Sequence, residues 1–189
     1  MNGSNSGSLR DHFLLAMPGL DAGIFAGSIT YICEHGEAGA MGLVINQPLE
    51  LMLGEIFEHL DIEPIPGFRD QAVLAGGPVQ IDHGFVLHRD SPRAWDSTLQ
   101  VTDSLQLTTS QDILKAIALG AGPTEYLVAL GYAGWSAGQL ESEIVENSWL
   151  TLPADHEVIF RTPVPKRVAR AAAALGVDMN LLTVDAGHA

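Results

Sequence analysis

The sequence predicts a single α/β (α+β) domain, in which about four helices pack on a mixed, largely antiparallel sheet or barrel-like core. Short apolar runs rich in β-branched and aromatic residues alternate with helical patterns along the chain. Only some of these runs are separated by a helix, which favours antiparallel neighbours over a doubly wound parallel sheet. The chain has 189 residues, of which 47% are hydrophobic, so it can bury one sizeable core.

Several short segments have the composition of strands, with valine, isoleucine, threonine, tyrosine and phenylalanine enriched. We expect strands at His12–Met17, Ser28–Glu34, Gly42–Ile45, Ala72–Ala75, Gly84–His88, Leu105–Thr108, Tyr126–Leu130 and Glu157–Arg161. Gly76-Gly77-Pro78 follows one of these strands, and its glycines indicate a positive φ or a close approach of two backbones.

Four helices are expected from apolar periodicity and capping residues. They are Leu51–Leu60, about Gln111–Leu119, a helix from about Ser136, and one that follows Thr162-Pro163 and ends at Gly176. Ser110 is placed to cap the second helix, and Pro163 suits the first position of the fourth.

Residues 1–11 are expected to form a flexible tail, because residues 2–8 are only Asn, Gly and Ser, and residues 12–189 a single domain. The start of the chain lacks the features of a secretory signal, and no apolar run approaches the roughly 20 residues that span a bilayer. Cys33 is the only cysteine, which excludes an intramolecular disulfide. We therefore predict a cytoplasmic protein that makes no contact with a membrane.

The formal net charge is −14, from 9 Lys and Arg against 23 Asp and Glu. A field of this sign repels a phosphate backbone, so the composition argues against direct binding to nucleic acid. Two other kinds of binding partner remain, a protein or a small-molecule ligand. Four cations gather near the last helix, either as an ordinary solvated face or as a site for a phosphate or an acidic partner: Arg161, Lys166, Arg167 and Arg170.

Cys33 and His35 lie two residues apart in a predicted strand, so both side chains are expected on one face, with Glu34 on the other. An imidazolium beside the thiol would lower the pKa of the thiol and make it a nucleophile or a redox sensor. The interpretation that we favour is a buried thiol that packs like a small apolar side chain.

The glycine-rich segment Gly131–Gly138 is expected to link a strand to a helix, where backbone N–H groups can hold an anion. Its spacing matches neither phosphate-binding fingerprint, and tight backbone packing explains the glycines more readily. Glu141 follows on the core-facing arc of the predicted helix, where a carboxylate needs a partner and indicates either a structural ion pair or a poised group of a site. Asn46 places an amide at a strand end, either in a cleft or as part of a turn.

No zinc, calcium or cysteine-pair motif occurs in the sequence. We therefore predict no metal site and assign no cofactor.

Four long blocks follow one another along the chain: PGLDAGIFAGSITYICEHGEAGAMGLVINQP (Pro18–Pro48), LAGGPVQIDHGFVLH (Leu74–His88), TTSQDILKAIALGAGP (Thr108–Pro123) and ALGYAGWSAGQLESEIVENSWL (Ala129–Leu150). In sequence and order they resemble the YqgE/AlgH-like family of bacterial proteins, and the similarity covers about residues 12–189. The resemblance implies a compact α/β fold with a β-barrel-like core. Through the name AlgH it also implies a role in regulating alginate production and related genes, and it brings no catalytic residues with it.

Two functions remain open. The first is a regulatory or binding protein, similar to AlgH, that acts through protein contacts and affects transcription indirectly. The second is an enzyme that binds a small molecule or a nucleotide in a pocket near residues 131–141. The residues that we expect to line such a pocket are Cys33, His35, Asn46, Gly134, Trp135 and Glu141.

Overall fold

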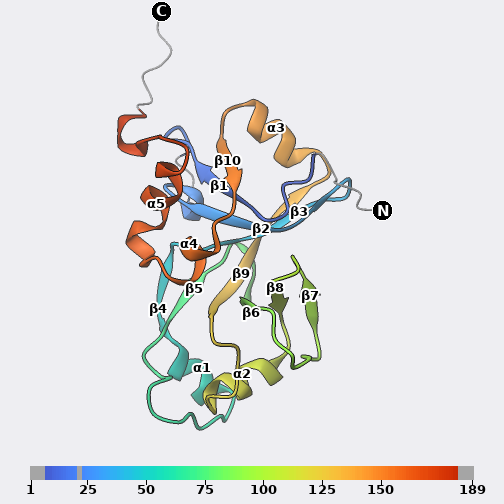
Figure 1. The fold of residues 1–189 in the computed structure, drawn as a ribbon, viewed down its shortest axis with the longest axis vertical. Coiled ribbons are helices and arrows are strands. Elements are labelled where there is room, and N and C mark those ends of the chain that lie inside the picture. The colour runs from blue at the N-terminus through green and yellow to red at the C-terminus, as the bar shows by residue number, and fades with distance from the viewer. Residues whose placement is uncertain (1–6, 21–22, 183–189) are drawn as a thin grey trace, which may run out of the picture.

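The computed structural model describes residues 7–20 and 23–182, which form one strongly curled ten-stranded sheet with five α-helices around it (Figure 1). The strands are β1 (His12–Ala16), β2 (Ile29–Gly36), β3 (Gly39–Val44), β4 (Pro48–Met52), β5 (Ala72–Ala75), β6 (Val79–Arg89), β7 (Thr98–Gln100), β8 (Leu105–Thr108), β9 (Tyr126–Ser136) and β10 (Trp149–Pro153). The helices are α1 (Leu53–His59), α2 (Gln111–Ala118), α3 (Gln139–Val145), α4 (His156–Phe160) and α5 (Arg167–Ala173).

The strands follow the order β10-β1-β2-β3-β9-β6-β8-β7, and each of these neighbours is antiparallel. β4 and β5 form a side branch, in which β5 pairs parallel to β9. The long strand β9 joins the two halves of the sheet, because its first part pairs with β6 and its last part with β3. Within the described residues, the path ends at β7 and β10 without closing, so the sheet is a half-barrel. The predicted α+β class with a largely antiparallel sheet is confirmed.

The chain crosses itself closely where Gly76 and Gly77 pass β9. A Cβ atom on Gly76 would lie 2.3 Å from the carbonyl oxygen of Gly131, and one on Gly77 would lie 2.0 Å from the carbonyl carbon of Tyr132. Gly131 itself has a φ of 74°, in the left-handed region. Glycine is required on both sides of this crossing, which confirms the close approach predicted for Gly76-Gly77.

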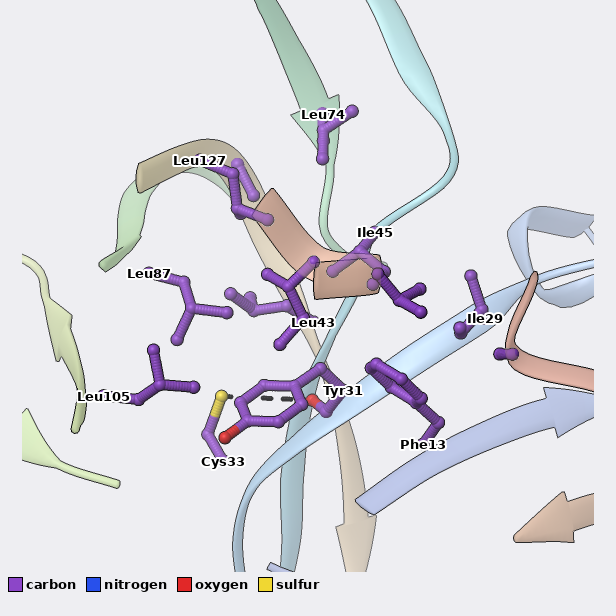
Figure 2. Close-up of a cluster of buried hydrophobic side chains, with 14 of the residues drawn as sticks. Phe13, Ile29, Tyr31, Cys33, Leu43, Ile45, Leu74, Leu87, Leu105 and Leu127 are labelled. Carbon is purple, nitrogen blue, oxygen red and sulfur yellow. Dashed lines mark hydrogen bonds between the residues drawn. The ribbon is translucent and has the colours of Figure 1, made fainter. Parts of the chain in front are cut away.

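The main core fills the inside of the half-barrel. Figure 2 shows side chains from five strands converging there: Phe13, Tyr31, Leu43, Leu87 and Leu127, each at most 7% exposed. Two smaller clusters lie under helices. One, beneath α1 and α2, includes Leu53, Phe57, Ile113 and Ile117, and the other, beside α3, includes Trp135, Leu140 and Trp149.

Two of the expected secondary-structure elements are wrong. Residues 157–160 belong to α4 and not to a strand, because Asp155 caps the start of the helix by accepting the backbone N–H of Glu157 at 2.9 Å, and Arg161 follows as the C-cap. The helix expected from about Ser136 begins at Gln139, because β9 continues through Ser136 and pairs with β3. Three strands were not predicted, namely β4, β7 and β10.

The basic segment near the last helix is partly structural. Arg161 pairs with Glu125 at 2.8 Å and with Glu157 at 3.0 Å. Arg167 is buried and donates to the backbone carbonyls of Thr162 and Ile45, which ties α5 to the end of β3. Burial lowers the pKa of the Arg167 guanidinium from its usual range. Two of the four cations therefore hold the fold together.

Within the described residues, none of the helices has the length and apolar character needed to cross a membrane.

Candidate functional site

An open cleft of about 730 Å³ lies between β7 and the paired ends of β2 and β3. We call it the edge cleft. Its apolar floor and mixed rim include Glu34, Met41, Phe85, Thr98, Leu99, Tyr132, Gly134 and Trp135. In Figure 1, β7 and β8 lie below β3 at the right of the view. Glu34 is the one charged residue that lines this cleft within the described part of the chain.

The strand that borders the edge cleft has an unpaired edge. β7 pairs with β8 and with no other strand among the described residues. The Thr109 N–H donates to the Ser97 carbonyl at 3.0 Å, and the Val101 N–H donates to the Leu105 carbonyl at 2.9 Å. Hydrogen-bonded positions alternate in an antiparallel pair, so the backbone N–H and C=O groups of Thr98 and Gln100 point away from β8. They are available to a further strand.

Trp135 lines the edge cleft, and its side chain belongs to a polar and aromatic cluster beside α3. Its indole N–H donates to the Glu143 carboxylate at 2.9 Å, and the indole of Trp149 donates to the same oxygen at 2.8 Å. The two indole rings meet edge to face, with their centroids 6.0 Å apart. Glu143 is not among the site residues predicted from the sequence. One signal was available, because a buried tryptophan needs an acceptor for its N–H group.

His35 and Glu141 lie together beside the edge cleft, in a shallow hollow of about 230 Å³. The backbone N–H of Leu9 donates to His35 Nδ1 at 2.8 Å, so the ring proton lies on Nε2. Nε2 then donates to Glu141 Oε1 at 2.6 Å. The Glu141 side chain is 52% exposed, so the expected position on the core-facing arc is wrong. The pKa of Glu141 is held below its usual value, first by its own backbone N–H and then by His35.

Cys33 is removed from this site. The pairing of β2 with β3 shifts between Ile32 and Glu34, so Cys33 is the extra residue of a β-bulge. Its side chain is fully buried in the main core (Figure 2) and its sulfur lies 3.9 Å from the Tyr31 carbonyl oxygen. Burial raises the pKa of the thiol well above its usual range. These observations support the interpretation of Cys33 as a packing residue.

Asn46 also lies apart from the edge cleft. Its side-chain oxygen accepts the Ile29 N–H at 3.0 Å, and its amide nitrogen donates to the Gly27 carbonyl at 3.0 Å. The amide therefore fixes the turn that leads into β2, as the turn interpretation predicts. Of the expected site residues, Gly134 and Trp135 line the edge cleft, His35 and Glu141 border it, and Cys33 and Asn46 do not.

A chain of polar side chains behind the core was not predicted from the sequence. The Arg89 guanidinium donates to His156 Nδ1 at 2.9 Å, and His156 Nε2 lies 3.0 Å from Asp11. The same Asp11 oxygen accepts the hydroxyl of the buried Tyr31 at 2.8 Å. Burial, followed by the Asp11 carboxylate, raises the pKa of Tyr31 far above its usual value. Because Asp11 lies just before β1, this chain joins the start of the sheet to α4 and β6.

In the described residues, no three His, Cys, Asp or Glu side chains are grouped so that they could hold a metal ion.

Comparison with known proteins identifies close relatives of the whole chain. A family model described as AlgH-like matches residues 13–180. A UPF0301 protein of Saccharophagus degradans is 58% identical over 182 residues, which cover 96% of this chain and 89% of that protein. A UPF0301 protein of Vibrio parahaemolyticus is 48% identical and covers 96% of this chain and 100% of its own length.

Two solved structures share the fold. The solution structure of the AlgH protein from Pseudomonas aeruginosa has a TM-score of 0.82 at 50% identity, with 100% of both chains covered. The crystal structure of a protein from Corynebacterium diphtheriae has a TM-score of 0.73 at 18% identity, and covers 93% of this chain and 92% of its own. The second likeness shows the fold alone.

Proposed function

This chain belongs to the AlgH-like family, and we propose that it is a cytoplasmic binding protein with a regulatory role, which captures an extended, basic segment of a partner protein in the edge cleft. One observation carries the proposal: the unpaired backbone edge of β7 borders a cleft of about 730 Å³. An exposed strand edge beside an apolar groove is the arrangement by which β-strand addition binds extended peptides.

The edge supports the backbone part of such binding. The N–H and C=O groups of Thr98 and Gln100 provide two pairs of donors and acceptors for an added strand. Side chains of the bound segment that alternate toward the protein meet Leu99, Phe85 and Tyr132 on the floor of the cleft. The backbone groups would supply affinity and the floor would supply specificity.

Charge supports a basic partner. Glu34 lines the edge cleft, and no Lys or Arg lines it in the described ranges. The whole chain carries a net charge of −14, which attracts cationic segments over long range and repels phosphate backbones. A regulatory effect on gene expression would therefore pass through a protein partner.

The test is a titration of the ¹⁵N-labelled full chain with two blocked octapeptides, one alternating valine with lysine and the other valine with glutamate. We expect the lysine peptide to shift the amide signals of Thr98, Leu99 and Gln100, and to bind about tenfold more tightly than the glutamate peptide. Tighter binding of the glutamate peptide, or shifts confined to other strands, would contradict the proposal.

Two variants and one control variant sharpen this test. Gly134→Leu places a side chain in the edge cleft, where its Cβ would meet only the ring of Tyr132, at 3.3 Å, so we expect peptide binding to be lost while the fold remains. Glu34→Gln removes the charge that lines the cleft and is expected to weaken the lysine peptide about three- to tenfold. Glu146→Gln, an exposed residue at the end of α3, changes the net charge equally and should leave binding unchanged.

The same titration distinguishes the alternative function, a small-molecule pocket near residues 131–141. If neither peptide binds, and a small molecule shifts Tyr132, Gly134 and Trp135, the cleft is a ligand pocket and the peptide proposal is wrong.

A further inference from the structure

A second cavity, of about 720 Å³, lies between α1, α2 and the other face of β6 and β9. We call it the helix cavity. The helix cavity and the edge cleft lie on opposite faces of β6, because Phe85 faces the edge cleft and the next residue, Val86, faces the helix cavity. Its floor is aliphatic, and it includes Leu51, Ile56, Leu60, Leu114, Val128 and Leu130.

The floor is open at one position of the sheet. Gly84 lines the helix cavity and lies two residues before Val86, so a side chain at this position would share the face of Val86. A Cβ atom built on Gly84 has no heavy atom within 4 Å. The strand therefore leaves a space where most residues would place a side chain.

The rim of the helix cavity is acidic. Glu55 of α1 and Asp82 of β6 both line it, and no Lys or Arg does so within the ranges that the structure describes. Glu55 accepts the Met52 N–H at 2.8 Å with one oxygen. Asp82 has neither a hydrogen-bond donor nor a cation paired with its side chain in the described residues. Two histidines, His59 and His83, also line the cavity.

A distortion of β6 brings Asp82 to this rim. Val79 pairs with Tyr132 and Gly84 pairs with Leu130, so residues 80–83 stand opposite the single residue Gly131. Gln80 has a φ of 49°, in the left-handed region. This long bulge lifts the segment from the sheet, and all of its residues are exposed. Its exposed carboxylate is therefore held beside an aliphatic floor.

We propose that the helix cavity binds a small aliphatic amine in its protonated form. The alkyl chain lies on the aliphatic floor beside Gly84, where its burial removes apolar surface from water. The ammonium group lies at the rim, where the carboxylates of Asp82 and Glu55 accept its N–H groups in charge-assisted hydrogen bonds. The hydroxyl of Thr109, which also lines the cavity, adds a further acceptor. The helix cavity and the edge cleft lie on opposite faces of β6, and an amine can bind here whether or not a peptide binds in the edge cleft.

The test compares three probes that share one chain and differ in charge: n-octylamine, 1-octanol and octanoate. Titrations of the ¹⁵N-labelled full chain are run at pH 8, where an ordinary histidine is neutral and an alkylamine is charged. We expect octylamine to shift Gly84, Leu114 and Leu130 with a dissociation constant on the order of 1 mM. Octanol should bind about tenfold more weakly, and octanoate more weakly still.

Variants assign the two halves of the site. Gly84→Leu fills the open position and should abolish octylamine binding without lowering the melting temperature, since leucine suits a strand better than glycine. Asp82→Asn and Glu55→Gln should each weaken octylamine about three- to tenfold and leave octanol unchanged. Gln at position 55 can still accept the Met52 N–H, so the start of α1 is preserved.

Two control variants separate this proposal from the peptide site. Gly134→Leu fills the edge cleft, and Glu146→Gln removes an equal charge at a distance, so neither should change octylamine binding. The proposal is overturned if octanoate binds as tightly as octylamine, if Gly84→Leu still binds octylamine, or if octylamine causes no shifts around the helix cavity. None of these outcomes decides whether a peptide binds at β7, so a failure of one proposal can be told apart from a failure of the other.

Discussion

His35 and Glu141, 106 positions apart in the sequence, are joined by a hydrogen bond of 2.6 Å between Nε2 and Oε1. Because His35 Nδ1 accepts the Leu9 N–H, the imidazole in this tautomer is neutral, and the contact is a hydrogen bond and not an ion pair. The bond ties the start of α3 to the end of β2 at the surface.

The first prediction concerns this bond. Glu141→Gln keeps an oxygen that accepts from Nε2, and the side chain is 52% exposed, so we expect a loss of less than about 1 kcal/mol in the free energy of unfolding. Urea denaturation of the variant and of the parent protein measures this difference in the free energy of unfolding. A loss of several kcal/mol would mean that the two residues form a buried ion pair after all.

Glu143 should be far more sensitive than Glu141. Glu143→Ala leaves the indole N–H groups of Trp135 and Trp149 without their acceptor, and both rings are almost fully buried. We expect a loss of about 2–3 kcal/mol, together with a change in tryptophan fluorescence. Equal stability of the Glu143→Ala and Glu141→Ala variants would show that the indoles find other acceptors.

Cys33 should be inert in the folded protein. Its side chain is fully buried and its pKa is raised, so little thiolate forms and none of it meets solvent. With iodoacetamide at pH 7, we expect modification at the rate of global unfolding, rising sharply once urea unfolds the chain. Rapid modification of the native protein would require an opening of the half-barrel at β2.

The stability of the protein should fall as the solution becomes mildly acidic. His88 is fully buried; its Nδ1–H donates to the Arg89 carbonyl, and its Nε2 accepts from the Thr108 hydroxyl. Burial lowers the pKa of His88, so the unfolded chain takes up the proton first. The contribution of neutral His88 to the free energy of unfolding is complete above the pKa of histidine in the unfolded chain, about 6.5. It is lost as the pH falls toward the lower pKa of His88 in the folded protein.

Urea titrations at pH 7.5 and 5.5 measure this effect. In His88→Gln the difference between the two pH values should be smaller than in the parent protein, although the variant is less stable at both. An unchanged difference would assign the pH dependence to other groups.

The fold class could be predicted from the sequence because it depends mainly on local patterns of residues. Apolar periodicity located α1, the residues at the helix start located α2, and strand composition located part of each of the long strands β6 and β9. The strand predicted at Glu157–Arg161 was wrong because Val158 and Ile159 are β-branched, which favours a strand. The helix that forms there depends on one capping side chain, Asp155.

The candidate site was only partly predictable for a different reason. Gly134 and Trp135 were found because glycine and tryptophan stand out in any sequence. Glu34 and Thr98 line the same cleft from strands 64 positions apart in the chain, so only the curl of the sheet brings them together. The alternation of side chains along a strand predicted that Cys33 and His35 share one face of β2. That prediction was wrong, because the bulge at Cys33 interrupts the alternation.

β8 forms part of the walls of both cavities. Leu107 of β8 lines the edge cleft and Thr108 lines the helix cavity, while Thr109, just after the strand, lines both. The hydroxyls of Thr98 and Thr108, one from each lining, lie 2.9 Å apart. Any ligand that displaces β8 on one side therefore alters the shape offered on the other. Thermodynamic linkage then requires a reciprocal effect: the factor by which the first ligand changes the affinity of the second equals the factor by which the second changes that of the first.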